Sequence, residues 1–87
     1  MISVLIPSQL TSYTDGASRV AVEGATVEAA LDDLDRRFPG LKFRVIDEQD
    51  CIRRHMRIFI GMDETRDVRR ALQPGDELMI FGALSGG

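Results

Sequence analysis

The chain has 87 residues, of which 44% are apolar and 29% charged, a balance typical of a single globular domain. Its net charge of -3 argues against a nucleic-acid binder, which needs a basic face. The lone cysteine, Cys51, excludes an internal disulfide and a multi-cysteine zinc site, so we expect a reducing, cytoplasmic setting. No apolar run approaches the roughly 18 residues that span a bilayer, and the N-terminus lacks the features of a cleaved leader.

The N-terminal segment predicts a β-hairpin. Residues 2–6 are rich in β-branched side chains and stop at Pro7, which suits a strand that ends there. Residues 7–17 have the Pro, Ser, Asp and Gly content of turns. Residues 18–22 alternate and are followed by Gly24, which indicates a second strand.

Residues 27–37 carry the clearest helical pattern. Thr26 can cap the first turn, Glu28 complements the positive end of the helix dipole, and Pro39-Gly40 ends the helix. Charged side chains cover the other sides. The apolar stripe that would face a core consists of Val27, Ala30, Leu31, Leu34 and Phe38.

The second half predicts three more strands. Residues 41–56 begin with a stretch that suits either a helical turn or a strand, and we interpret the whole as a connecting excursion. Residues 57–60 are expected to form a strand, 61–64 a turn and 65–68 a short edge strand. The last strand is predicted at 77–82, after the Pro-Gly turn.

This order of elements predicts a two-layer α+β domain over residues 1–82, with a flexible tail at 83–87. One main helix would pack on one face of a mixed sheet of four to five strands. The arrangement resembles the ubiquitin-like β-grasp fold.

The sequence ends in ALSGG, and a Gly-Gly pair alone is a weak signal because small polar residues favour frayed termini. Here, however, the pair directly follows a strand of a β-grasp-like order. Nearly the whole chain resembles the family of the molybdopterin synthase small subunit and the thiamine sulfur carrier, the MoaD/ThiS family. The resemblance is carried by MISVLIPS, GATVEAALDDLDRRFPG, RIFI, LQPGDELMIF and the closing SGG.

The resemblance implies a sulfur carrier rather than an enzyme. In the family, an E1-like enzyme uses ATP to adenylate the terminal carboxylate, here that of Gly87. A sulfur donor protein then converts it to a thiocarboxylate. Gly86 would have to lack a side chain to enter the narrow slot of the activating enzyme. No cofactor is expected to be bound, because ATP belongs to the partner.

The recipient of the sulfur stays open, with a preference for the large subunit of molybdopterin synthase over cysteine and other sulfur pathways. Two alternatives remain. The chain could be a protein modifier that forms isopeptide bonds through Gly87, or an interaction module with an inert tail.

Other side chains give weaker signals. Cys51 has no CxxC partner, and His55 has no nearby second ligand, so we expect no metal site. The arginine pairs are too short for nucleic-acid recognition. The acidic cluster of the helix is expected to lie on its solvated side and to bind nothing in particular; it consists of Asp32, Asp33 and Asp35.

The strands carry more apolar residues than one covered face requires. If alternate residues face the helix, then Phe59, Met79 and Phe81, with Leu5 at the edge, point to the open face. We interpret these residues, together with Leu84 of the tail, as a surface for partner binding. The alternative is that residues 41–56 fold over this face.

Overall fold

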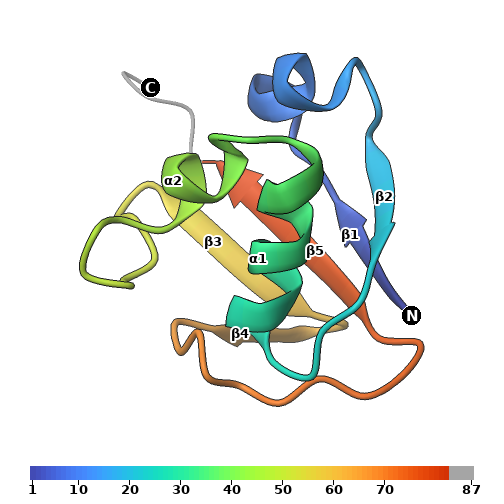
Figure 1. Ribbon diagram of the computed structural model, residues 1–87. Coiled ribbons are helices and arrows are strands. Elements are labelled where there is room, and N and C mark those ends of the chain that lie inside the picture. The colour runs from blue at the N-terminus through green and yellow to red at the C-terminus, as the bar shows by residue number, and fades with distance from the viewer. Residues whose placement is uncertain (83–87) are drawn as a thin grey trace.

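The computed structural model describes residues 1–82, which form five strands, one main helix and two shorter helices (Figure 1). The predicted flexible tail at 83–87 lies outside the described residues. In chain order the elements are β1 (Ile2–Leu5), the 3₁₀ helix η1 (Ser8–Thr14), β2 (Arg19–Val22), α1 (Val27–Arg37), α2 (Leu41–Val45), β3 (Met56–Ile60), β4 (Asp63–Thr65) and β5 (Glu77–Gly82).

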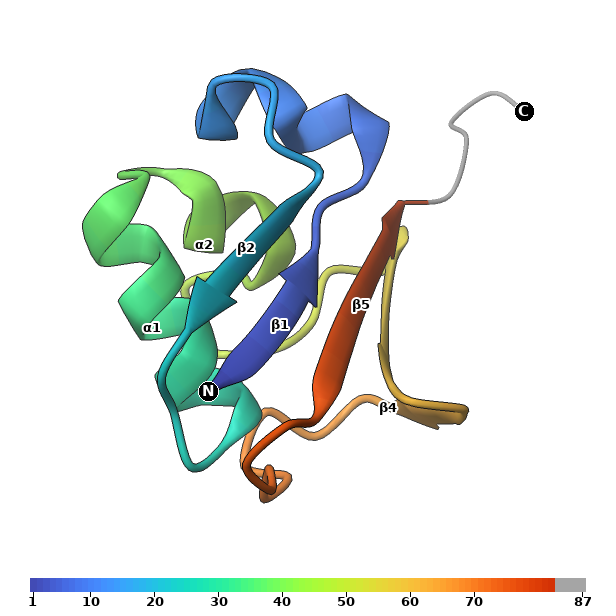
Figure 2. The ribbon, with the colours of Figure 1, turned by 90° about the vertical axis from the view of Figure 1, so that its right-hand side faces the viewer.

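The strands form one mixed sheet in the order β2-β1-β5-β3-β4. Its centre is the parallel pair β1 and β5, the first and last strands of the chain, in which Val4 lies beside Leu78. The remaining pairs are antiparallel. The helices α1 and α2 lie on one side of the sheet (Figure 2). The expected two-layer α+β architecture is confirmed.

Side chains alternate between the two faces of the sheet, and the predicted register is correct. Alternate residues of β1, β3 and β5 are buried beneath α1, and the predicted stripe of the helix packs on them. Thr26 caps α1 as expected, because its Oγ1 accepts from the Ala29 N–H at 3.1 Å. The inward strand residues are Ile2, Val4, Met56, Ile58, Ile60, Leu78 and Ile80.

Residues 41–56 do not cover the open face, so that alternative is wrong. The segment starts with α2, which packs beside α1, and continues as a narrow loop closed by the bridge between Ile46 and Ile52. Leu41 and Val45 of α2 are fully buried in the same core as α1. The segment therefore extends the helical layer and leaves the other side of the sheet uncovered.

Two segments depart from the sequence prediction by more than one residue at a boundary. Residues 8–14, expected as turn, form η1 and bury Leu10 in the core. The edge strand β4 occupies residues 63–65 instead of 65–68, because Ile60 pairs directly with Asp63 across a two-residue loop. Gly61 begins this loop with a φ of 60°, which suits the tight Gly-X hairpins.

The expectation that the acidic cluster is merely solvated was wrong. The Asp33 carboxylate is almost buried and accepts hydrogen bonds from the Glu23 N–H at 2.9 Å and the Arg36 guanidinium at 2.6 Å. Asp35 accepts from the Gly40 and Lys42 N–H groups, and Asp32 pairs with the Lys42 ammonium. These carboxylates fix α1 to the end of β2 and to the start of α2.

Glycine at position 24 allows this close approach of β2 and α1. A Cβ at Gly24 would lie only 2.4 Å from the Ala30 nitrogen, a contact with backbone that no side-chain movement relieves. The turn from β2 into α1 therefore requires glycine for space and not for an unusual φ.

Asp33→Asn should make the protein less stable near neutral pH. The Glu23 N–H, and after it the Arg36 guanidinium, hold the pKa of Asp33 below its ordinary value of 3.8. Since the pKa is lowered by folding, the stabilisation is complete above about pH 4 and is lost as the pH falls through the folded-state pKa. Urea unfolding from pH 7 to pH 2.5 should show the two proteins converging in acid. Glu48→Gln, at an exposed carboxylate, is the control. If the free energy of unfolding of the parent and of Asp33→Asn changed with pH in parallel, this role of Asp33 would be contradicted.

Candidate functional site

The open face of the sheet carries a row of apolar side chains across its three central strands. Leu5 lies beside Met79 in the β1–β5 pair, and Met79 lies opposite Phe59 in the β5–β3 pair. Phe81, one alternation further along β5, meets Phe59 edge to face with 5.6 Å between the ring centroids. We call Leu5, Phe59, Met79 and Phe81 the apolar patch; they are the four predicted residues that lie in the described part of the chain.

The apolar patch is accessible to a partner. Phe81 is 49% exposed and the other three side chains are half-buried. Their neighbours along the same strands are buried on the opposite face. The exposure therefore follows from the alternation of side chains along a strand and not from a local distortion.

Ion pairs border the apolar patch on two sides. Arg19 on β2 pairs with Glu77 on β5 at 3.2 Å, and Arg57 on β3 pairs with Glu64 on β4 at 3.4 Å. An apolar centre inside a charged rim is the usual anatomy of a protein-binding surface.

The end of β5 fixes the point from which the last residues continue. Gly82 pairs with Met56, and its carbonyl accepts a hydrogen bond at 3.2 Å from the side chain of Gln9 in η1. Sequence reasoning missed Gln9, because no pattern in the chain connects positions 9 and 82. The predicted site residues Leu84, Gly86 and Gly87 lie outside the described residues.

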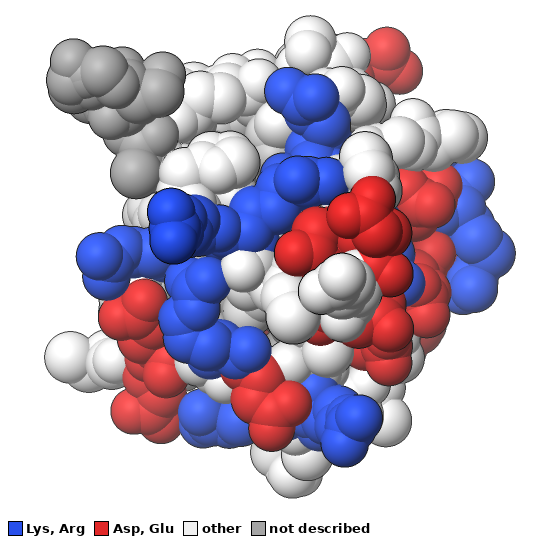
Figure 3. All heavy atoms as spheres, turned by 90° about the vertical axis from the view of Figure 1, so that its left-hand side faces the viewer, with Lys and Arg blue, Asp and Glu red and all other residues white. Residues whose placement is uncertain are grey.

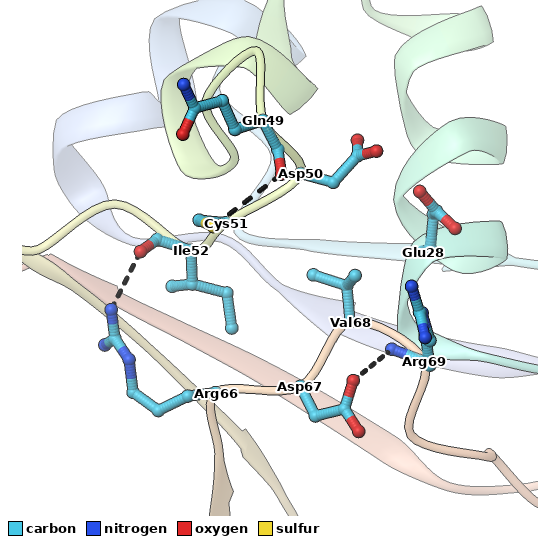
Figure 4. A pocket seen from close by; sticks show the side chains of 9 residues that line it. All are labelled: Glu28, Gln49, Asp50, Cys51, Ile52, Arg66, Asp67, Val68 and Arg69. Atoms are coloured by element: carbon cyan, nitrogen blue, oxygen red, sulfur yellow. Dashed lines mark hydrogen bonds between the residues drawn. The ribbon is translucent and has the colours of Figure 1, made fainter.

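A hollow of about 540 Å³ opens between the 46–52 loop and the segment after β4 (Figure 4). Cys51 lies at its rim, where the thiol contacts the Gln49 carbonyl at 3.6 Å. The Asp47 carboxylate accepts from the Cys51 and Gln49 N–H groups, which lowers the pKa of Asp47 and shapes the loop. These contacts are hydrogen bonds within the loop that carries Cys51, and they fix its shape.

Across the same hollow, Arg66 holds the loop in place. Its guanidinium donates at 2.8 Å to the carbonyls of both Ile52 and Met56.

Within residues 1–82 no three His, Cys, Asp or Glu side chains come together as metal ligands. None of the helices in that range is long and apolar enough to cross a membrane.

A central parallel pair formed by the first and last strands, with helices on one face and an apolar patch on the other, defines a ubiquitin-like β-grasp domain. The model of the ThiS family matches residues 4–87, and the chain belongs to this family. Its members are small sulfur carrier proteins and are not enzymes themselves.

Individual relatives agree with this assignment. The chain is 28% identical to the sulfur carrier protein CysO of Mycobacterium tuberculosis, over 99% of this chain and 98% of that protein. CysO in the Amycolatopsis orientalis BexX/CysO complex matches with a TM-score of 0.93 and 30% identity over the full length of both chains. The small archaeal modifier protein SAMP1 of Haloferax volcanii matches with a TM-score of 0.78 and 30% identity, over 99% and 98% of the two chains.

Phe81→Asp should leave the melting temperature nearly unchanged, because this side chain faces solvent on the open face. Ile80→Asp, one residue away, should prevent folding, because Ile80 is 2% exposed and an unpaired carboxylate would be buried in the core. Thermal unfolding followed by circular dichroism compares the two. Unfolding of the Phe81 variant alone would show that the register is inverted.

Proposed function

We propose that this chain carries sulfur on the C-terminal carboxylate of Gly87. The observation that supports this most directly is the family match, which continues through residue 87. The carboxylate attacks the α-phosphate of ATP in an E1-like enzyme, giving an acyl-adenylate and releasing pyrophosphate. The terminal sulfur of a donor persulfide then displaces AMP, and a second thiol cleaves the S–S bond to leave the thiocarboxylate. ATP is bound by the enzyme and not by this chain.

The apolar patch is the surface that we propose for docking to the activating enzyme. One relative, CysO of Amycolatopsis orientalis, is in complex with another protein, BexX. In this chain the patch is the exposed apolar cluster nearest to the end of β5, since Phe81 is followed directly by Gly82. A partner bound there would be placed to receive the residues that follow.

Phe81→Asp should therefore weaken binding to the activating enzyme by at least about tenfold. Burying a large side chain in a partner contributes about 1.5–3 kcal/mol, and tenfold corresponds to about 1.4 kcal/mol. Titration of the enzyme with each protein by calorimetry measures the change. Equal affinities would remove the apolar patch from the interface while leaving the role of Gly87 intact.

Protein modification is the second candidate function. The likeness to SAMP1 of Haloferax volcanii, a small archaeal modifier protein, supports it. In that role the adenylated Gly87 would be transferred to a lysine amine and form an isopeptide bond. Both functions use the same first step, so activation alone does not separate them.

The relatives also bear on which enzyme accepts the sulfur. The matched carriers are CysO proteins, and they give no support to the preference for a molybdopterin synthase large subunit as the partner. We propose instead an acceptor enzyme that takes sulfur from a CysO-type carrier, acting in the cytoplasm where the lone cysteine stays reduced.

Deleting Gly87 should abolish activation without affecting the fold, because the core lies within residues 2–80. ATP–pyrophosphate exchange, measured with the activating enzyme of the same organism, reports adenylation directly. Circular dichroism of the deletion variant checks the fold. Exchange at the parent rate would contradict both the carrier and the modifier proposals and leave an interaction module with an inert tail.

A further inference from the structure

A second surface adjoins the start of β3, where Met56 pairs with Gly82, and combines one exposed aromatic ring with three arginines. Phe43 in α2 is 52% exposed, and the Arg53 guanidinium lies over its ring at 4.6 Å from the centroid. The Arg53 side chain also donates to the Phe43 carbonyl at 2.8 Å. Arg44 follows Phe43 and Arg54 follows Arg53 in the chain, both of their side chains are exposed, and the Arg53 N–H joins the two segments through the Val45 carbonyl. We call Phe43, Arg44, Arg53 and Arg54 the arginine patch.

The arginines of this patch form no ion pair in the described part of the chain. The nearby carboxylate is that of Asp47, whose pKa is lowered by backbone N–H groups of its own loop and also by the charge of Arg53. The ion pairs found within residues 1–82 involve other basic residues, such as Arg19, Arg57 and Lys42. None of them includes Arg44, Arg53 or Arg54, and the side chains of Arg44 and Arg54 are exposed. Arginine and aromatic side chains together are typical of the residues that contribute most to protein–protein binding.

The arginine patch has a fixed position relative to the end of the last strand. Met56, two residues after Arg54, pairs with Gly82. The Arg66 guanidinium fixes the intervening loop from the other side through the Ile52 and Met56 carbonyls. Figure 1 shows α2 and the end of β5 at the same end of the molecule. A partner that receives the residues after Gly82 would therefore border this surface.

Both signs of charge are present on this side of the molecule. Lys and Arg form a band across this face, with Asp and Glu on both sides of it (Figure 3). The same loop contributes the acidic residues Asp47, Glu48 and Asp50. A nucleic-acid backbone would be repelled by these carboxylates, whereas a protein surface can match both signs of charge.

We propose that the arginine patch binds an acidic surface of the activating enzyme, beside the slot that receives the residues after Gly82. This inference rests on the proposed carrier function. The guanidinium groups would pair with carboxylates of the enzyme and Phe43 would pack between them. Such a contact fixes the orientation of the domain and speeds its association with the enzyme.

Charge-reversal variants test the proposal with a matched control. Arg54→Glu and Arg44→Glu each reverse a guanidinium that has no hydrogen-bond partner in the described residues. Arg69→Glu makes the same charge change at another exposed arginine without an ion pair there, in the loop after β4 and away from Gly82. The second-order rate constant for ATP–pyrophosphate exchange should fall about tenfold for the first two variants at low salt, and the difference should shrink at high salt.

The outcomes distinguish this inference from the function on which it rests. Absence of exchange with the unmodified chain would overturn the carrier function and the arginine patch together. Normal exchange by folded Arg44→Glu and Arg54→Glu variants would overturn the patch alone. An equal loss in Arg69→Glu would overturn a specific surface in favour of net charge. A labelled single-stranded RNA that bound the unmodified chain but not Arg54→Glu would assign the patch to nucleic acid and overturn a protein partner.

Discussion

The parallel pairing of β1 with β5 is the constraint on which the rest of the molecule depends. It places the first and last strands side by side in the middle of the sheet, with Val4 against Leu78 and Leu5 against Met79. Because side chains alternate along a strand, this register decides at once which residues enter the core and which form the open face. A slip of one residue would bury Met79 and Phe81 and expose Leu78 and Ile80.

The two faces of the sheet consequently have different tasks. The helical layer, extended by α2 and the 46–52 loop, accounts for the core and therefore for folding. The open face presents the apolar patch between two ion pairs. The last strand ends beside this patch, with Gly82 held by Gln9 and paired with Met56. Under the proposed function the side chains do no chemistry, and the fold would serve to position one terminus and the surfaces around it.

Local patterns were sufficient to predict the parts of the fold that depend on periodicity and capping. The helix at 27–37 with its Thr26 cap, the strands around 2–5 and 77–82, and the outward direction of Phe59 and Phe81 were all predicted correctly. The apolar patch could be predicted because it follows from a period of two once the core residues are assigned.

The features that were missed depend on contacts between distant segments. Asp33 looks like any helix-surface carboxylate until the Glu23 N–H is brought next to it. Gln9 and Arg66 carry no pattern that connects them to the carbonyls they bind, 73 and 14 residues away. The apolar residues of the 41–56 segment follow neither helical nor strand periodicity. Packing against α1 therefore decides that the segment begins with α2 and leaves the open face of the sheet uncovered.

The intact mass of the chain tests the central claim most directly. The chain is incubated with the activating enzyme of its own organism, ATP and a persulfide donor, and then fragmented to locate any change. The carrier account predicts a gain equal to the difference between one sulfur and one oxygen atom, confined to the fragment that contains Gly87. An unchanged mass, or adducts joined to other proteins without any thiocarboxylate, would contradict it.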